Sequence, residues 1–183
     1  MIKSSSAVIL TVFAFLNAAS AAQPGPYAGQ EQREIKALSS DEIQSYLAGK
    51  GAGFAKAAEL NDYPGPAHVL ELADSLQLSE EQKTRTQSIF DAMQKEAVRQ
   101  GKVLVEKERE LDRLFATGKV TEDSLRVTIR EIGALQAEVR RAHLQAHLEQ
   151  RAVLTKTQIA KYNELRGYAS KNGQTHGGHS HGH

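Results

Sequence analysis

The chain has 183 residues, of which 25% are charged and 5% aromatic, with a formal net charge of +1. This composition indicates one helical domain with a thin core, and the near balance of charges gives no indication of nucleic acid or an anionic membrane surface as a partner. The sequence contains no cysteine, which excludes disulfides, thiolate metal sites and cysteine nucleophiles.

Residues 1–21 have the pattern of a signal peptide. Lys3 supplies a positive start, residues 7–16 are apolar, and Ala19-Ser20-Ala21 forms an A-x-A cleavage site. The apolar run is shorter than the roughly 20 residues that a membrane-spanning helix needs. Of the 23 basic residues only Lys3 lies in this segment, so 22 basic and 22 acidic residues remain after cleavage. We therefore expect export to the periplasm of a Gram-negative cell, without stable membrane insertion.

Residues 22–65 are predicted to form an N-terminal arm with short helices. Proline and glycine residues predict an irregular first part of this arm. Ser39 and Glu42 then form a capping-box pattern, which predicts a short helix that nearby glycines interrupt. A second short helix is expected over residues 54–60, and the turn sequence at residues 61–66 separates the arm from the main body.

Residues 66–169 are predicted to form a long antiparallel helical hairpin with short flanking helices, in an all-α fold. The first of these helices starts at Pro66 and carries four apolar residues, Val69, Leu70, Leu72 and Leu76. The first arm is expected at about residues 80–116, because apolar residues recur there at helical spacing. Gly118 ends this arm and Thr121 can cap the second. A single helix of that length cannot bury its apolar stripe alone, so the arms are expected to pair.

Two five-residue motifs begin helices in this domain: Leu78-Ser79-Glu80-Glu81-Gln82 and Leu154-Thr155-Lys156-Thr157-Gln158. Each is a capping box, and the first opens the first arm whereas the second opens the helix after the second arm. This arrangement resembles the LTxxQ repeat of the Spy/CpxP family of periplasmic stress proteins and their metal-responsive relatives, over residues 66–168. The first copy departs from the pattern because Ser79 replaces threonine. The residues that define the two motifs are Leu78, Ser79, Gln82, Leu154, Thr155 and Gln158.

The resemblance implies a cradle-like helical protein that is often dimeric. Its known members are ATP-independent chaperones, inhibitors of envelope-stress sensor kinases, or binders of zinc, nickel or cobalt. Non-native periplasmic proteins or the periplasmic domain of a sensor kinase are thus the expected partners. A homodimer that forms through the long apolar stripe is the expected assembly.

His143 and His147 are four residues apart on the predicted second arm, so their rings lie on one side of the helix. Two imidazoles in this arrangement can share one divalent ion, provided that a third or fourth ligand joins them. The alternative is that both are surface or edge residues beside Ala142 and Ala146. The motif is not the HExxH of zinc proteases, because Leu144 stands where that motif has glutamate.

Residues 170–183 are predicted to be a flexible tail that is rich in histidine. Glycine and serine separate its four candidate metal ligands, which are His176, His179, His181 and His183. Imidazole suits Zn²⁺, Ni²⁺, Co²⁺ and Cu²⁺, so these ions are candidate ligands although no obligatory cofactor is expected. The alternative is a solvated tail in which the histidines are incidental.

Two functions follow from these patterns. The first is an envelope or heavy-metal stress protein that binds non-native proteins or a stress-sensor partner, with metal as a modulator. The second is a periplasmic sensor or buffer of divalent metal that uses the histidine pair and the tail. No enzymatic activity is expected, because the sequence has no nucleotide-binding loop, activated nucleophile or paired-carboxylate motif.

Overall fold

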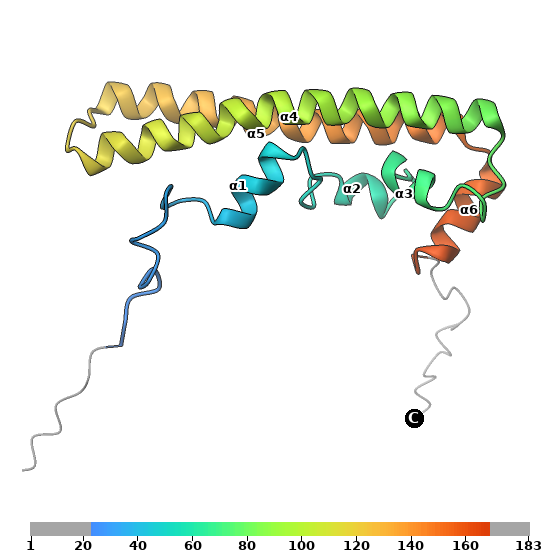
Figure 1. Ribbon diagram of the computed structural model, residues 1–183, viewed down its shortest axis with the longest axis horizontal. Coiled ribbons are helices and arrows are strands. Elements are labelled where there is room, and N and C mark those ends of the chain that lie inside the picture. Colours follow the sequence, from blue (N-terminus) through green and yellow to red (C-terminus); the bar gives the residue numbers. More distant parts are fainter. Residues whose placement is uncertain (1–22, 169–183) are drawn as a thin grey trace, which may run out of the picture. The chain divides into compact units, whose positions relative to one another are not determined.

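The computed structural model describes residues 23–168, and all regular secondary structure in that range is helical (Figure 1). The chain divides into two units, residues 1–31 and residues 32–183. In the first unit, residues 25–30 form turns closed by hydrogen bonds from Ala28 N–H to Gly25 O and from Gln30 N–H to Tyr27 O, both 3.0 Å long. The second unit carries the helices, and the prediction of an all-α fold is confirmed.

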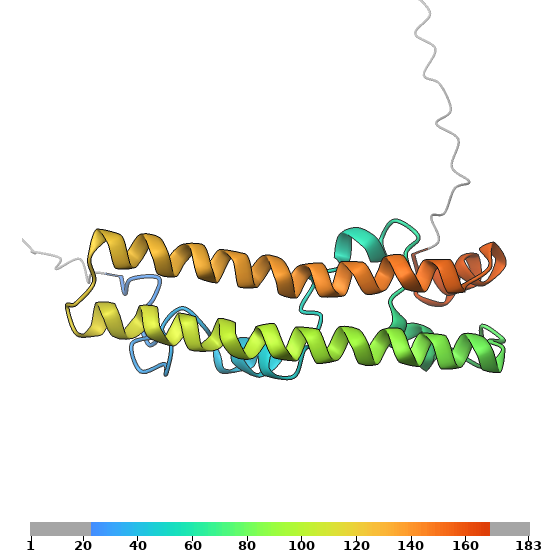
Figure 2. The ribbon, with the colours of Figure 1, turned by 90° about the horizontal axis from the view of Figure 1, so that it is seen from above.

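The centre of the second unit is a long hairpin of α4 (Glu80–Ala116) and α5 (Glu122–Val153), which run side by side (Figures 1 and 2). The predicted capping boxes at Ser79 and Thr121 begin the two helices. Gly118 adopts a positive φ of 64° in the turn between them. The buried apolar residues of the pair are mostly small or branched: Ala97, Leu104, Val105, Ile132, Val139, Ala142, Ala146 and Val153. The predicted helical hairpin is therefore confirmed.

Three short helices pack against the hairpin: α1 (Ser40–Leu47), α2 (Lys56–Glu59) and α3 (Pro66–Glu71). Helix α3 ends earlier than the sequence predicts. The chain turns after Glu71, and Gln77 in this turn adopts a positive φ of 53°. Leu76 is nevertheless buried in this turn. A last helix, α6 (Lys156–Leu165), follows α5 after the extended residue Leu154 and turns away from the hairpin axis (Figure 1).

The segment before α1 contributes to the core although it is not helical. Ile35 and Leu38 are buried, and they form an apolar cluster with Ile43 of α1 and Val105 of α4. Lys36 pairs with Asp112 of α4 at 3.4 Å. Part of the apolar stripe of α4 is therefore covered by residues of the same chain.

Gly101 allows α1 to approach α4 closely. A Cβ atom at this buried position would lie 2.2 Å from the carbonyl oxygen of Tyr46, which is far inside van der Waals contact. The chain then leaves α1 through Gly49, whose φ of 63° favours glycine. None of the helices within residues 23–168 has an apolar stretch long enough to cross a bilayer.

Candidate functional site

The two Leu-hydroxyl-x-x-Gln motifs lie against each other, although 76 residues separate their glutamines. Gln82 Nε2 donates to Gln158 Oε1 at 2.9 Å and to the carbonyl of Val153 at 2.9 Å. Gln158 Nε2 donates to Gln82 Oε1 at 3.0 Å and to the carbonyl of Leu76 at 3.2 Å. Each glutamine therefore caps its own helix and also holds the backbone that precedes the other motif.

The leucines and hydroxyl residues of the motifs have separate local roles. Leu78 and Leu154 are buried in one cluster with Val69, Leu76 and Tyr162. Ser79 Oγ and Thr155 Oγ1 each accept from the backbone N–H of the glutamine three residues later, at 3.2 Å. The pair thus joins the starts of α4 and α6, and its geometry indicates a structural joint.

His143 and His147 are both buried, so neither is the surface residue of the alternative interpretation. His143 Nδ1 lies 2.9 Å from the carbonyl oxygen of Val139, and His147 Nδ1 lies 2.7 Å from that of Tyr63. A carbonyl oxygen can only accept, so each Nδ1 carries the proton and donates it. In the neutral form of each ring, the Nε2 atom is then an acceptor.

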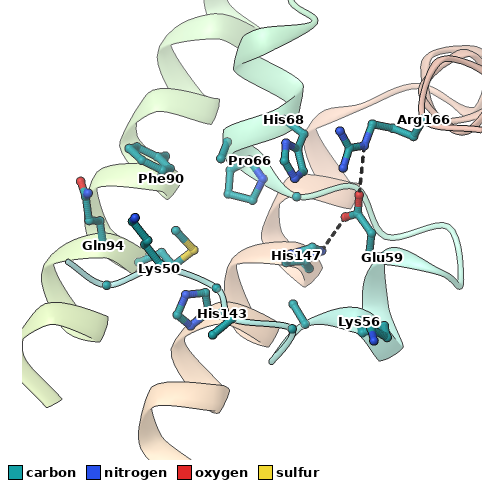
Figure 3. Close-up of a pocket in the computed structure, with 18 of the residues that line it drawn as sticks. Lys50, Lys56, Glu59, Pro66, His68, Phe90, Gln94, His143, His147 and Arg166 are labelled. Carbon is teal, nitrogen blue, oxygen red and sulfur yellow. Dashed lines mark ion pairs between the residues drawn. The ribbon is translucent and has the colours of Figure 1, made fainter. Parts of the chain in front are cut away.

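Both histidines line a cavity of about 570 Å³ (Figure 3). Its wall is formed by residues 48–68, by Phe90 and Met93 of α4, by the two histidines of α5, and by Arg166 and Tyr168. Most of the wall is apolar, and the polar groups converge on it from segments that are distant in sequence. This combination is typical of a ligand-binding cavity.

Glu59 of α2 is the acidic group of the cavity wall. Its Oε1 accepts from the hydroxyl of Tyr162 and lies 3.7 Å from Nε of Arg166, while its Oε2 lies 3.7 Å from Nδ1 of His147 (Figure 3). Burial raises the pKa of Tyr162, so the phenol stays protonated and donates. Sequence reasoning did not identify Glu59 or Arg166, because each reaches the cavity only through tertiary packing.

His147 is neutral at neutral pH. Burial lowers its pKa from 6.5 and outweighs the hydrogen bond to Tyr63 and the nearby Glu59 carboxylate, which raise it. The contact between His147 and Glu59 is therefore made by an uncharged imidazole. Gly65 packs against the same ring, since a Cβ there would lie 3.0 Å from His147 Nε2.

Three buried polar atoms on the wall have no hydrogen-bond partner among residues 23–168: Glu59 Oε2, His143 Nε2 and Arg166 Nε. An unpaired buried group of this kind costs on the order of 1–3 kcal/mol. Two of the three atoms are acceptors, and the third belongs to a guanidinium that faces Glu59. The wall therefore offers two acceptors, Glu59 Oε2 and His143 Nε2, and one donor, Arg166 Nε, to a bound molecule.

Among residues 23–168, no third ligand is in place for the metal site predicted at His143 and His147. Within the part of the chain that the structure describes, no group of three or more His, Asp or Glu side chains is arranged to hold a metal ion. His68 also lines the cavity, but its Nδ1 lies 3.0 Å from Glu71 Oε2. The tail ligands His176, His179, His181 and His183 lie outside the described residues.

A second feature lies at the turn of the hairpin, where four large apolar side chains are exposed. Phe115 is 57% exposed, Val127 52%, Ile129 49% and Leu125 36%. A hollow of about 490 Å³ lies beside Phe115, and its wall is largely apolar. Leu125 and Ile129, four residues apart, share one side of α5, whereas Val127 lies on the other side. We call these four exposed side chains the hairpin-tip cluster.

No family model matches the chain, and no curated protein or solved structure was found to be similar to it. The resemblance to the Spy/CpxP family therefore rests on the two motifs. The cavity and the hairpin-tip cluster are the features on which a functional proposal can be built.

Proposed function

We propose that this protein is a periplasmic stress protein of the Spy/CpxP kind that binds non-native proteins at the hairpin tip. The observation that supports this proposal is the hairpin-tip cluster. Large apolar side chains exposed at one end of the hairpin are candidates for contact with another chain. The hollow beside Phe115 offers room for an apolar side chain of a bound chain.

The charges around the cluster favour weak and unspecific contact. Arg113 and Lys119 lie beside it in sequence, and so do Glu122, Asp123 and Arg126. Because both signs are present, no single charge selects one partner. We therefore propose an unfolded client. The periplasmic domain of a sensor kinase, which is one particular folded partner, is the alternative.

Export is part of this proposal, and it has its own test. Expression in a Gram-negative host followed by osmotic shock should release the protein with the periplasmic fraction. N-terminal sequencing should find cleavage after residue 21. Retention in the cytoplasm with an intact N-terminus would overturn this part of the proposal.

Protection of reduced α-lactalbumin from aggregation tests the client-binding activity. Dithiothreitol unfolds that client by reducing its disulfides, whereas this chain contains no cysteine and is unaffected. Light scattering should rise more slowly when the protein is added. The double variant Val127→Ser/Ile129→Ser should protect less, while Leu148→Ser, which removes another exposed side chain of α5, should protect as the wild type does.

Sedimentation of the same variants separates client binding from self-association. Equal protection by the tip variant and the wild type would overturn the proposal. If the tip variant converts a dimer into a monomer without a change in protection, the cluster is a contact between copies of the chain.

A second candidate function, metal binding, is supported by the acceptor Nε2 atoms of His143 and His147. Calorimetric titration with Zn²⁺, Ni²⁺, Co²⁺ and Cu²⁺ tests it, with His143→Ala/His147→Ala and a chain that ends at residue 169 as the variants. Loss of binding in one variant assigns the ligands to the cavity or to the tail. Absence of binding in the intact chain would remove this candidate.

A further inference from the structure

We propose that the cavity beside His143 binds a small molecule with an apolar body and one neutral hydrogen-bond donor, such as an amine N–H, an amide or a hydroxyl. This inference goes beyond the binding of client proteins, which is assigned to the other end of the hairpin. The volume of about 570 Å³ lies within the ~300–1,000 Å³ typical of sites for small ligands. The apolar part of the wall, which includes Phe90, Met93 and Pro66, suits a hydrocarbon or aromatic body.

His143 determines that the ligand must donate. Only 3% of this residue is exposed, and its Nδ1–H is already bonded to the carbonyl of Val139. The remaining ring nitrogen, Nε2, is buried and has no partner among the described residues. A purely apolar ligand would leave this acceptor unpaired, whereas a donor on the ligand would satisfy it.

The wall carries charges of both signs, with Glu59 as its acidic group and Lys50, Lys56 and Arg166 as its basic groups. Glu59, whose Oε2 is the second unpaired acceptor, disfavours a carboxylate or phosphate ligand. Lys50 and Lys56, which also line the cavity, disfavour an ammonium. Arg166 lies 3.7 Å from Glu59 and offsets its charge. A neutral donor is repelled by neither sign of charge, and it is the group that the unpaired Nε2 of His143 can bind.

A side chain introduced at Gly51 would fill part of the cavity without a steric clash at its Cβ atom. A Cβ at this position would lie 3.6 Å from Cδ2 and 3.9 Å from Nε2 of His143, which is ordinary contact. A larger side chain there would start 3.9 Å from the acceptor and take up part of the cavity that Gly51 lines. Gly51→Leu is therefore the blocking variant.

Fluorescence titration with two matched probes tests the proposal. N-phenyl-1-naphthylamine carries one N–H between its aromatic groups, and 1-benzylnaphthalene carries a CH₂ at the same place. We expect the amine to bind with a Kd on the order of 10–100 µM. The hydrocarbon should bind about tenfold more weakly, since it leaves the Nε2 acceptor unpaired.

Three variants show where the probes bind and which residue accepts the hydrogen bond from the amine. Gly51→Leu should abolish binding of both probes, and His143→Phe should remove the preference for the amine by weakening the amine alone. His68→Phe, which alters the histidine paired with Glu71, should keep the preference. Circular dichroism and urea denaturation verify that each variant is folded.

Several results would overturn the inference. If the intact chain binds neither probe, the cavity is not a site of this kind. If both probes bind equally, His143 does not select a donor. If Gly51→Leu binds the amine as the wild type does, the probe binds elsewhere, including at the hairpin tip, and the client-binding proposal is unaffected.

Discussion

At the scale of single residues, two glycines in the middle of the long helices should respond in opposite ways to the same substitution. Gly133 of α5 is exposed with open space around it, so Gly133→Ala should stabilise the fold by about 0.5–1 kcal/mol through helix propensity. Gly101→Ala gains the same propensity but places Cβ 2.2 Å from Tyr46 O, so a net loss of about 1–3 kcal/mol is expected. Urea denaturation measures both. A stabilised Gly101→Ala would mean that α1 does not pack on α4.

His147 should make the stability depend on pH in a defined window. Its pKa in the folded chain lies below 6.5, the value for an unperturbed histidine. As the pH falls through 6.5, the unfolded chain takes up the proton first, so the free energy of unfolding decreases. Above this window the imidazole is neutral in both states and the stability is fully present.

Urea midpoints at about pH 7.5 and about pH 5.5 measure this effect. The wild type should lose stability between the two conditions. His147→Asn should lose less, because its side-chain amide occupies the position of Nδ1, can donate to the carbonyl of Tyr63 and does not titrate. Glu96, with a pKa of about 2, remains ionised throughout. An equal loss in the variant would assign the pH dependence to another group.

The candidate site could be predicted from the sequence only in part. The spacing of His143 and His147 predicts that their rings lie on one side of a helix, and the structure places both on the cavity wall. Glu59 and Arg166 could not be predicted, since they lie 107 residues apart in sequence and meet through packing alone. Burial of the two histidines likewise depends on the segment before α3, whose path no local signal determines.

At the scale of elements, the paired motifs predict a measurable coupling between Gln82 and Gln158. The two side-chain amides exchange hydrogen bonds of 2.9 and 3.0 Å, so each single substitution by alanine breaks the same pair. A double-mutant cycle in urea should give a coupling energy of about 1 kcal/mol. Gln87→Ala, which removes an exposed glutamine that bonds Asp91 in the same helix, serves as the control. Strict additivity of the two motif substitutions would mean that the amides do not interact in solution.

Helix starts were the best predicted elements of the fold because capping is local. Side chains at Ser39, Ser79, Thr121 and Thr155 all cap helices where the sequence predicts starts. The end of α3 and the irregular segments were predicted less well. The packing of Ile35 against Val105 has no periodic pattern in the sequence, and it depends on contacts that form only after the hairpin exists.

At the scale of the whole second unit, the cavity and the hairpin tip should act independently. Phe90 lines the cavity and Phe115 belongs to the tip, and the 25 residues between them correspond to roughly 37 Å along α4. Substitutions this far apart, which share no partner, are expected to be additive.

The combined variant Gly51→Leu/Val127→Ser/Ile129→Ser tests this independence. It should lose binding of N-phenyl-1-naphthylamine to the same extent as Gly51→Leu, and protection of reduced α-lactalbumin to the same extent as the tip variant. Saturating N-phenyl-1-naphthylamine should likewise leave protection by the wild type unchanged, because the ligand and the client occupy different ends of α4. A change in protection when the probe binds would instead show that occupation of the cavity alters the hairpin, since a ligand can influence a distant site only if it binds two states of the protein with different affinity.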